Sequence, residues 1–435
     1  MHSMKNIIQS ISILSLAITL SVMNTGCKKD FTNPSAATSE QVLSSAKGLA
    51  GTAVGLQRIY AANVAYGLYD ANGLVTNETI LMNAGNTSEF QFSTGGTAVD
   101  GTNALLGNVW SSASKVIYDA NNVINGAANV TDKGYASGLI GYATIYKAAS
   151  MGTLAQLWEK VPDTIGVNAP TFSDRMVGFA RAIAAIDKAL AAISANPISA
   201  SFSTDIPAGI DIVNTLYALK ARYALFSGNY AAALTAANLV DLTKRSTMNF
   251  EAANPNPVFN TVTSTNNVYQ AKDSTLGLPT DIAPDLADKR IQFYTLINPT
   301  INPRFRLNGF WNAATAPLPL YYPGEIMLIK AEAYARSTTP DLTKGFEQLN
   351  LVVTKKAAND ALGIGADLPT VATTTAADLL TQIYRNRCIE LYLSGLKLED
   401  MRRFGRATTE RKRNFFPYPF RERDGNSNTP ADPSF

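Results

Sequence analysis

The chain has 435 residues, a formal net charge of +3 at pH 7 and a hydrophobic fraction of 46%. That hydrophobic fraction is normal for a folded protein and argues against wholesale disorder, and the near-neutral charge gives no general case for binding nucleic acid. The single histidine is His2. If the N-terminal residues are removed as an export leader, the mature chain contains no histidine. Ser-His-Asp hydrolysis, Cys-His proteolysis and histidine-ligated zinc are then excluded.

The first residues have the features of an export leader. An apolar run over residues 7–22 ends shortly before Gly26 and Cys27. The run is short for a membrane-spanning helix and typical of a signal-peptide core. A small residue directly before a cysteine resembles a bacterial lipoprotein signal, in which the cysteine is lipidated and becomes the mature N-terminus. We therefore expect residues 1–26 to be a signal peptide and Cys27 to carry a lipid anchor to a membrane; an ordinary secretory leader cut elsewhere is the alternative.

Four segments of the first half have helical periodicity, and one stretch between them does not. Apolar residues at helical spacing predict helices over 39–60, 110–130, 138–162 and 179–193. From 66 to 107 the periodicity fades, and Gly, Asn, Thr and Ser dominate, which predicts long loops. Loops on a rigid scaffold are where binding residues concentrate, so this stretch is a candidate ligand region.

Residues 217–240 have the pattern of two helices joined by a tight turn. Gly228 and Asn229 can adopt the left-handed conformation that ends one helix and turns the chain. Three small residues let the two helices approach closely: Ala221, Ala224 and Ala233. The unit resembles one tetratricopeptide repeat, which buries its apolar face only by stacking on neighbouring repeats; an ordinary helical hairpin is the alternative.

The second half begins with another stretch without helical period. Prolines between residues 250 and 320 break any long helix there. A second helical pair is predicted over 321–336 and 341–353, with small residues along its seam at Ala331, Ala333 and Ala335. The last helical segment spans 379–406.

Motifs along nearly the whole mature chain, from Cys27 to Glu422, resemble those of one protein family. Residues 325–335 resemble a Glu-x-x-Leu-x-x-Ala-Glu-Ala helix, 288–290 an Asp-x-Arg turn, and 110–124 a Trp…Ile…Ala-Asn-x-Val-Ile helix. Residues 416–419 with Glu422 resemble a closing Pro-x-Pro-x-x-Glu segment. A C-terminal signature is matched by Arg387, Glu390, Leu391, Gly395, Asp400 and Arg403, with departures at Asn386, Ser394 and Lys397. Together with the leader, these motifs resemble the SusD/RagB family, the nutrient-binding lipoproteins of Bacteroidetes.

The resemblance implies an all-α fold, built on about four tetratricopeptide-like helix pairs with long loop insertions. It implies one SusD-like domain over 27–435, with an N-terminal part over about 27–250 and a C-terminal part over about 251–435. Family members are lipid-anchored at the outer membrane, on the cell surface, where they capture an oligosaccharide or another nutrient oligomer. They deliver it to a SusC-like TonB-dependent transporter, do no chemistry on it and need no cofactor. We therefore expect a protein that is not an enzyme.

Two other classes of function remain open. A secreted hydrolase can use paired carboxylates and needs no histidine, although no motif marks such a pair and no metal motif is present. A helical-repeat adaptor would bind only proteins. Product release would reveal a hydrolase, and glycan or peptide binding in the absence of the transporter would distinguish ligand capture from adaptor work.

The last helical segment carries many charges. Arg387 and Glu390 lie three residues apart on one helix face and can pair. We interpret the arginines between residues 385 and 423 as a solvated face or as salt bridges to neighbouring loops rather than as a phosphate site. Cys388 in the same helix is expected to be a small buried residue rather than a reactive thiol.

We place the ligand site where the regions 66–107 and 280–311 converge, because helices in a repeat stack bury one another and leave the loops as adaptable surface. Flat rings can stack on sugar faces, while amides and carboxylates bond hydroxyls. The predicted rings are Trp311, Phe310, Tyr294, Tyr69 and Phe90, and the predicted hydroxyl partners are Asp70, Asn86 and Glu89. Trp311 is the first choice, and packing in the base of the loop is the alternative for it, since tryptophan is highly buried on average.

Overall fold

Helices make up most of the structure, and the strands are short. The computed structural model describes residues 42–372 and 375–435, so the predicted signal peptide and Cys27 lie outside the described residues. The helices are α3 (Ala46–Ile59), α4 (Tyr66–Val75), α5 (Thr87–Thr94), α6 (Ala104–Ala127), α7 (Lys133–Leu157), α8 (Arg175–Ala195), α9 (Ala200–Asp205), α10 (Ile212–Phe226), α11 (Tyr230–Ala237), α12 (Lys289–Tyr294), α13 (Pro323–Arg336), α14 (Leu342–Val353), α15 (Ala376–Glu390), α16 (Lys397–Arg403) and α17 (Phe420–Gly425).

The strands pair two by two, and each pair is antiparallel. β1 (Thr79–Leu81) pairs with β5 (Tyr269–Ala271), β2 (Lys160–Pro162) with β3 (Phe172–Asp174), β4 (Thr247–Met248) with β8 (Leu318–Pro319), and β6 (Thr295–Ile297) with β7 (Phe305–Leu307). A π-helical segment, Tyr60–Ala65, joins α3 to α4.

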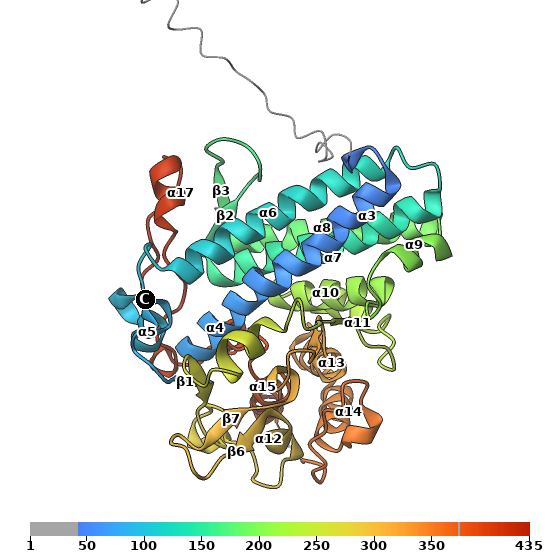
Figure 1. Cartoon of the computed structure of the whole chain (residues 1–435). Coiled ribbons are helices and arrows are strands. Elements are labelled where there is room, and N and C mark those ends of the chain that lie inside the picture. Colours follow the sequence, from blue (N-terminus) through green and yellow to red (C-terminus); the bar gives the residue numbers. More distant parts are fainter. Residues whose placement is uncertain (1–41, 373–374) are drawn as a thin grey trace, which may run out of the picture. The chain divides into compact units, whose positions relative to one another are not determined.

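Successive helices pack side by side into a stack (Figure 1). α6 packs against α7, α7 against α8, α8 against α10, α10 against α11, α11 against α13 and α13 against α14, while α15 packs on both α13 and α14. Several of these helices begin at a side chain that accepts a hydrogen bond from a first-turn N–H: Asn103, Asp132, Asp174 and Asp211. The stack confirms the predicted all-α scaffold.

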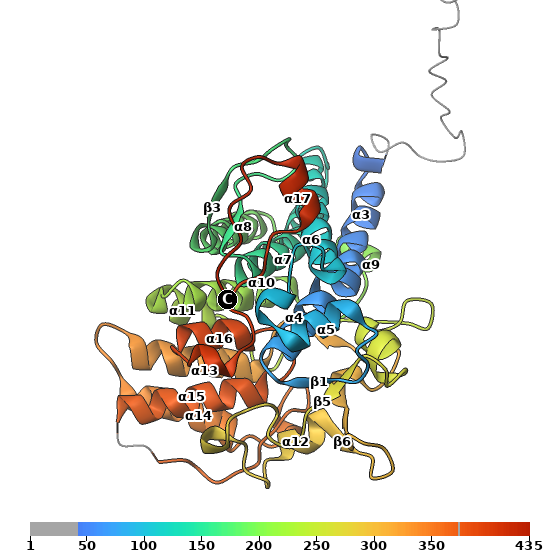
Figure 2. The same cartoon turned by 90° about the vertical axis from the view of Figure 1, so that its left-hand side faces the viewer.

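The long insertions lie outside the stack, and the C-terminal residues return to it. Seen from the side (Figure 2), α16 lies beside α13 and α15, and α17 lies next to α6. The region from Val42 to Phe435 forms one compact unit. The division near residue 250 stays a prediction.

The α10–α11 hairpin has the geometry expected of its sequence. Gly228 has a φ of +71°, and the Asn229 side chain caps α11 by accepting a hydrogen bond from the Ala232 N–H at 3.1 Å. The small residues of the seam are buried where the two helices meet: Ala221, Ala224 and Ala233. The left-handed conformation therefore belongs to Gly228, whereas Asn229, at a φ of −87°, acts as a cap.

The stretch from 66 to 107, predicted as long loops, contains the helices α4 and α5. Every residue of α4 is buried. A helix that is buried on all sides has no apolar stripe, and the polar Asp70 and Asn72 interrupt its hydrophobic pattern further, so its sequence has little helical period. The stretch from 250 to 320 likewise contains α12 and strands β5 to β8 as well as loops.

Arg387 and Glu390 do not pair with each other, which corrects the prediction from their spacing. The Arg387 Nε donates to Asp400 at 2.8 Å, whereas Glu390 accepts from Arg290 at 3.1 Å and from Lys355. These partners belong to other elements, so the tertiary structure and not the helix face decides the pairing.

Other arginines of the C-terminal segment also form salt bridges, with nearby residues of the same segment. Arg402 pairs with Glu399 and Arg406 with Glu410. Cys388 is buried, and burial raises the pKa of its thiol to about 12. It is therefore the small buried residue that the sequence predicts.

Ala233→Leu is expected to lower the free energy of unfolding by about 1–3 kcal/mol, because the larger side chain overpacks the α10–α11 seam. Ala231 on the same helix is exposed, so Ala231→Leu is the matched control and should leave the stability nearly unchanged. The measurement is urea denaturation of both variants. Equal stabilities of the two variants would show that the seam is not close-packed.

Candidate functional site

Most of the predicted ligand residues lie in the interior: Trp311, Phe310, Tyr294, Tyr69 and Asp70. Trp311 is 1% exposed, and its ring stacks on Tyr294, with the centroids 5.8 Å apart, and meets Tyr392 edge-on at 6.0 Å. The Tyr294 hydroxyl donates to the Glu390 carbonyl oxygen at 2.6 Å. These five side chains are buried because the segments that carry them fold onto the core, and Trp311 is the packed residue of the alternative.

The other predicted residues lie on α5 or at its start. Phe90 is 45% exposed, so its ring is open to a ligand. Asn86 is partly exposed, and its amide donates to the Asn267 carbonyl oxygen at 2.8 Å. Glu89 is buried, and burial raises the pKa of its carboxyl group. Ligand contact by these three residues stays a prediction.

Asp70 is a fully buried carboxyl group that has no hydrogen-bond partner among the described residues. Burial, and after it the nearby Glu89 carboxylate, raises the pKa of Asp70 well above its ordinary value. Both effects favour the neutral acid. Asp70 is thus a buried group of the fold and does not offer a carboxylate to a ligand hydroxyl.

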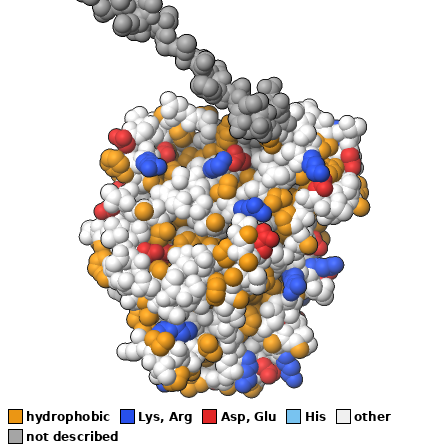
Figure 3. Space-filling view, viewed as in Figure 1, with side chains coloured by type: hydrophobic (Ala, Val, Ile, Leu, Met, Phe, Trp, Pro, Cys, Tyr) orange, Lys and Arg blue, Asp and Glu red, His pale blue; other side chains and the backbone are white. Residues whose placement is uncertain are grey.

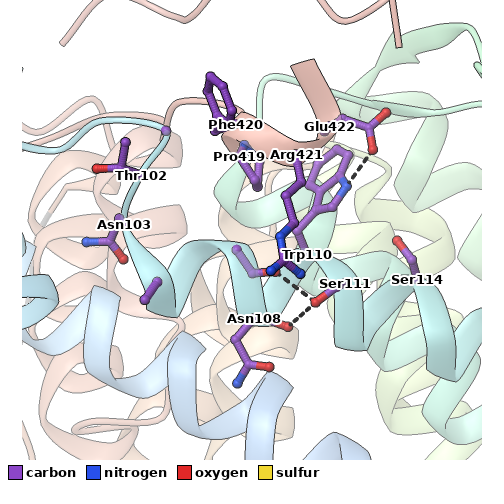
Figure 4. A pocket seen from close by; sticks show the side chains of 13 residues that line it. Thr102, Asn103, Asn108, Trp110, Ser111, Ser114, Pro419, Phe420, Arg421 and Glu422 are labelled. Carbon is purple, nitrogen blue, oxygen red and sulfur yellow. Dashed lines mark hydrogen bonds between the residues drawn. The ribbon is translucent and has the colours of Figure 1, made fainter. Parts of the chain in front are cut away.

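A pocket lies between the start of α6 and the segment that leads into α17 (Figure 4). Its volume is about 770 Å³, and ligand pockets typically measure roughly 300–1,000 Å³. One wall comes from residues 101–114 and the other from residues 419–422. The two walls come from distant parts of the sequence and meet only in the folded chain.

Trp110 lines this pocket and belongs to a cluster of aromatic rings packed behind it. Trp110 meets Trp158 edge-on at 4.8 Å and Tyr418 at 5.8 Å, and it stacks on Phe172 at 6.2 Å. The Trp110 indole N–H donates to the Glu422 carboxylate at 3.0 Å. These contacts fasten the C-terminal wall to α6, so the pocket exists before any ligand binds.

The walls of this pocket offer one exposed ring and several polar groups. Phe420 is 61% exposed, and Asn108 and Ser111 lie exposed on the surface of α6. Arg421 extends from the start of α17 towards α6 (Figure 4) and forms no ion pair with another described residue. A flat ring beside amide, hydroxyl and guanidinium groups can bind a ligand that is rich in hydroxyl groups.

The sequence marks both walls as family-like motifs but assigns a ligand to neither. Trp110 and Glu422 are 312 residues apart, and no local pattern predicts their contact. The available signal was the pair Phe420–Arg421, an aromatic and a cationic residue directly after a proline-rich segment. It becomes informative only once both side chains are known to be exposed.

Trp311→Ala is expected to lower the free energy of unfolding by about 3–5 kcal/mol, because it leaves a large cavity between packed rings. Phe90→Ala removes an exposed ring and should change the melting temperature little. Thermal melts of the two variants check this. A Trp311→Ala variant that melts like the unaltered protein would contradict the packed position.

Asp70→Asn is expected to stabilise the protein at neutral pH. The carboxyl pKa is about 4 in the unfolded chain, and it is raised in the folded chain. The contribution of Asp70 to stability is therefore most favourable below about pH 4 and is lost as the pH rises through the folded pKa. Asparagine does not titrate, so the difference in melting temperature between variant and wild type should grow from pH 4 to pH 8. The control is Asp424→Asn, at an exposed position. A difference that does not change with pH would contradict the buried neutral acid.

No family model matches the chain, and no curated protein matches it. Solved structures match it over most of its length. A SusD homolog from Bacteroides thetaiotaomicron is 12% identical, with 92% of this chain and 99% of that chain covered and a TM-score of 0.71. A SusD-like carbohydrate binding protein from Bacteroides vulgatus is 17% identical, with 82% and 83% covered and a TM-score of 0.62. A laminarin binding SusD-like protein is 14% identical, with 90% and 99% covered and a TM-score of 0.66. The chain therefore has the SusD-like fold.

Proposed function

We propose that this chain is a cell-surface lipoprotein that captures an oligosaccharide and delivers it to a SusC-like TonB-dependent transporter of the outer membrane. Two of the similar structures are named as binding a carbohydrate or laminarin. Their likeness supports the proposal through the shared fold. The pocket beside α17 supports it through its chemistry.

The observation that carries the proposal is an exposed ring next to hydrogen-bonding groups on walls that are held in place. Phe420 can stack on the flat face of a sugar ring, and the polar side chains of α6 can bond its hydroxyls. The Trp110 cluster holds both walls in place, so ordering them costs little on binding. Arg421 extends this polar surface and can donate to hydroxyl or carboxylate oxygens of a glycan.

The pocket favours binding over hydrolysis. Glycoside hydrolysis usually requires two carboxyl groups on either side of the scissile bond. Glu422 is the one carboxyl group among the described residues of the pocket lining, and its oxygens accept from Trp110 at 3.0 Å and from Asn426 at 2.9 Å. A secreted hydrolase that uses this pocket would lack the second carboxylate.

The surface charge gives no support for a nucleic-acid ligand. On the face shown in Figure 3, basic and acidic side chains are interspersed among uncharged atoms. That face therefore lacks the single-sign basic patch that binds nucleic acid.

No helix among the described residues combines the length and apolar character that crossing a membrane requires.

The anchor and the transporter belong to the proposal as well. Cys27 would carry the lipid, as its position after the apolar run and Gly26 predicts. Copurification of a TonB-dependent barrel from membranes would support delivery. A chain that binds only proteins, and no glycan, would favour the adaptor alternative.

Phe420→Ala is expected to weaken glycan binding by about 1–3 kcal/mol, by analogy with base stacking on aromatic rings, and to leave the melting temperature unchanged. Affinity electrophoresis against soluble polysaccharides, with laminarin among them, identifies a ligand, and calorimetry then measures the affinity. Phe90→Ala is the comparison variant. Unchanged affinity in Phe420→Ala together with weaker binding in Phe90→Ala would move the site to α5.

A further inference from the structure

A second cavity, of about 170 Å³, lies between α6, α7, α8 and the β2–β3 hairpin. It shares no lining residue with the pocket beside α17. Its walls are largely apolar, with Ile117, Met151, Leu154 and Val161 among them. The volume is far below that of the pocket, so this cavity suits a small molecule and not a chain of sugars.

Lys147 is a basic side chain in the lining of this apolar space. It lies on α7, it is partly buried, and its amine forms no hydrogen bond or ion pair with another described residue. Burial, and after it the nearby Lys188 charge, lowers the pKa of the Lys147 amine. An ammonium group without a counter-ion in such surroundings is unfavourable, so a small anion that enters the cavity would be stabilised by it.

The other charged groups of the cavity are engaged with each other. Arg181 binds Asp163 at 2.6 Å, and Asp163 also accepts from the hydroxyls of Ser173 and, at 2.6 Å, Thr171. The bonds from Ser173, Thr171 and Arg181 lower the pKa of Asp163 to about 2. Asp163 is thus ionised and already has its partners, and it lies beyond ion-pair distance of Lys147.

We propose that this cavity binds a small monocarboxylate with an apolar body, such as a branched aliphatic or an aromatic acid. The carboxylate would pair with the Lys147 ammonium, and the Asn121 amide of α6, which bonds no other described residue, would donate to it. The body of the acid would lie against Met151 and Leu154. A charge-assisted hydrogen bond is stronger than a neutral one, and the apolar walls add contact that a bare inorganic anion does not use.

The site does not depend on glycan binding, so its test is independent of the proposed function. Benzoate and 4-methylpentanoate are the probes, benzamide is the neutral match, and inorganic phosphate is the anion without an apolar body. Calorimetry with the mature chain is expected to show binding of at least one of the two acids, and markedly weaker binding of benzamide and phosphate.

Lys147→Met keeps the apolar stem and removes the charge, and it is expected to weaken binding of the acid about tenfold or more. Lys244→Met, at an exposed lysine away from the cavity lining, is the matched control and should bind the acid normally. Asn121→Leu removes the amide and fills part of the cavity, so it should also weaken binding. If Lys147→Met does not fold, Asn121→Leu decides.

Several results would overturn the proposal. They are failure of both acids to bind, equal binding of benzamide and benzoate, and undiminished binding in a folded Lys147→Met variant. Phosphate that binds as tightly as benzoate would show a general anion site and overturn the assignment to carboxylates. If Lys147→Met does not fold, undiminished binding of the acid in Asn121→Leu would overturn the proposal.

Discussion

The arrangement of the helices depends on ion pairs that are buried inside the stack. Five carboxylates, none more than 1% exposed, each pair with a cation from another element: Glu325, Glu332, Glu390, Glu399 and Asp400. Arg222 of α10 binds Glu325 of α13 at 2.6 Å, and Arg175 of α8 binds Glu399 of α16 at 2.8 Å. Such pairs add little net stability, but leaving one partner alone costs about 3–5 kcal/mol, so packings that separate the partners are disfavoured.

These pairs also position the candidate ligand pocket. The pairs of Arg175 with Glu399, Arg387 with Asp400 and Arg403 with Glu332 hold α16 against the stack. The chain that follows α16 then returns to α6. The Trp158 indole N–H donates to the Pro417 carbonyl oxygen at 2.9 Å, and the Asn426 amide donates to the Pro170 carbonyl oxygen at 2.9 Å. The C-terminal wall of the pocket is therefore fixed by directional bonds to elements of the first half, and it leaves Phe420 exposed beside the polar surface of α6.

The β2–β3 hairpin lies next to both candidate sites. Phe172 of β3 stacks on Trp110, which lines the pocket, whereas Val161 of β2 lines the small cavity. The two sites differ in chemistry because their walls differ. The pocket combines a ring with hydroxyl and amide groups and suits a polar, extended ligand, whereas the cavity combines apolar walls with the single unpaired charge of Lys147 and suits a small acid.

The sequence by itself determined the helical scaffold and the α10–α11 hairpin, because short-range physics decides them. Gly228 tolerates a positive φ, and small residues such as Ala233 permit close helix packing, whatever lies further away. It also predicted that Cys388 is buried. It did not reveal α4, whose burial on all sides removes the helical period, and it paired Arg387 with Glu390, although Asp400 is the partner in the folded chain.

The candidate site was decided by the tertiary structure alone. Trp311 and Phe420 are both aromatic residues in proline-rich, aperiodic segments, and nothing local to either tells which one is exposed. Long-range packing buries Trp311 between Tyr294 and Tyr392, while the bond between Trp110 and Glu422 places Phe420 at the surface of a pocket. Exposure depends on contacts between residues that are hundreds of positions apart, and a sequence read along the chain does not contain them.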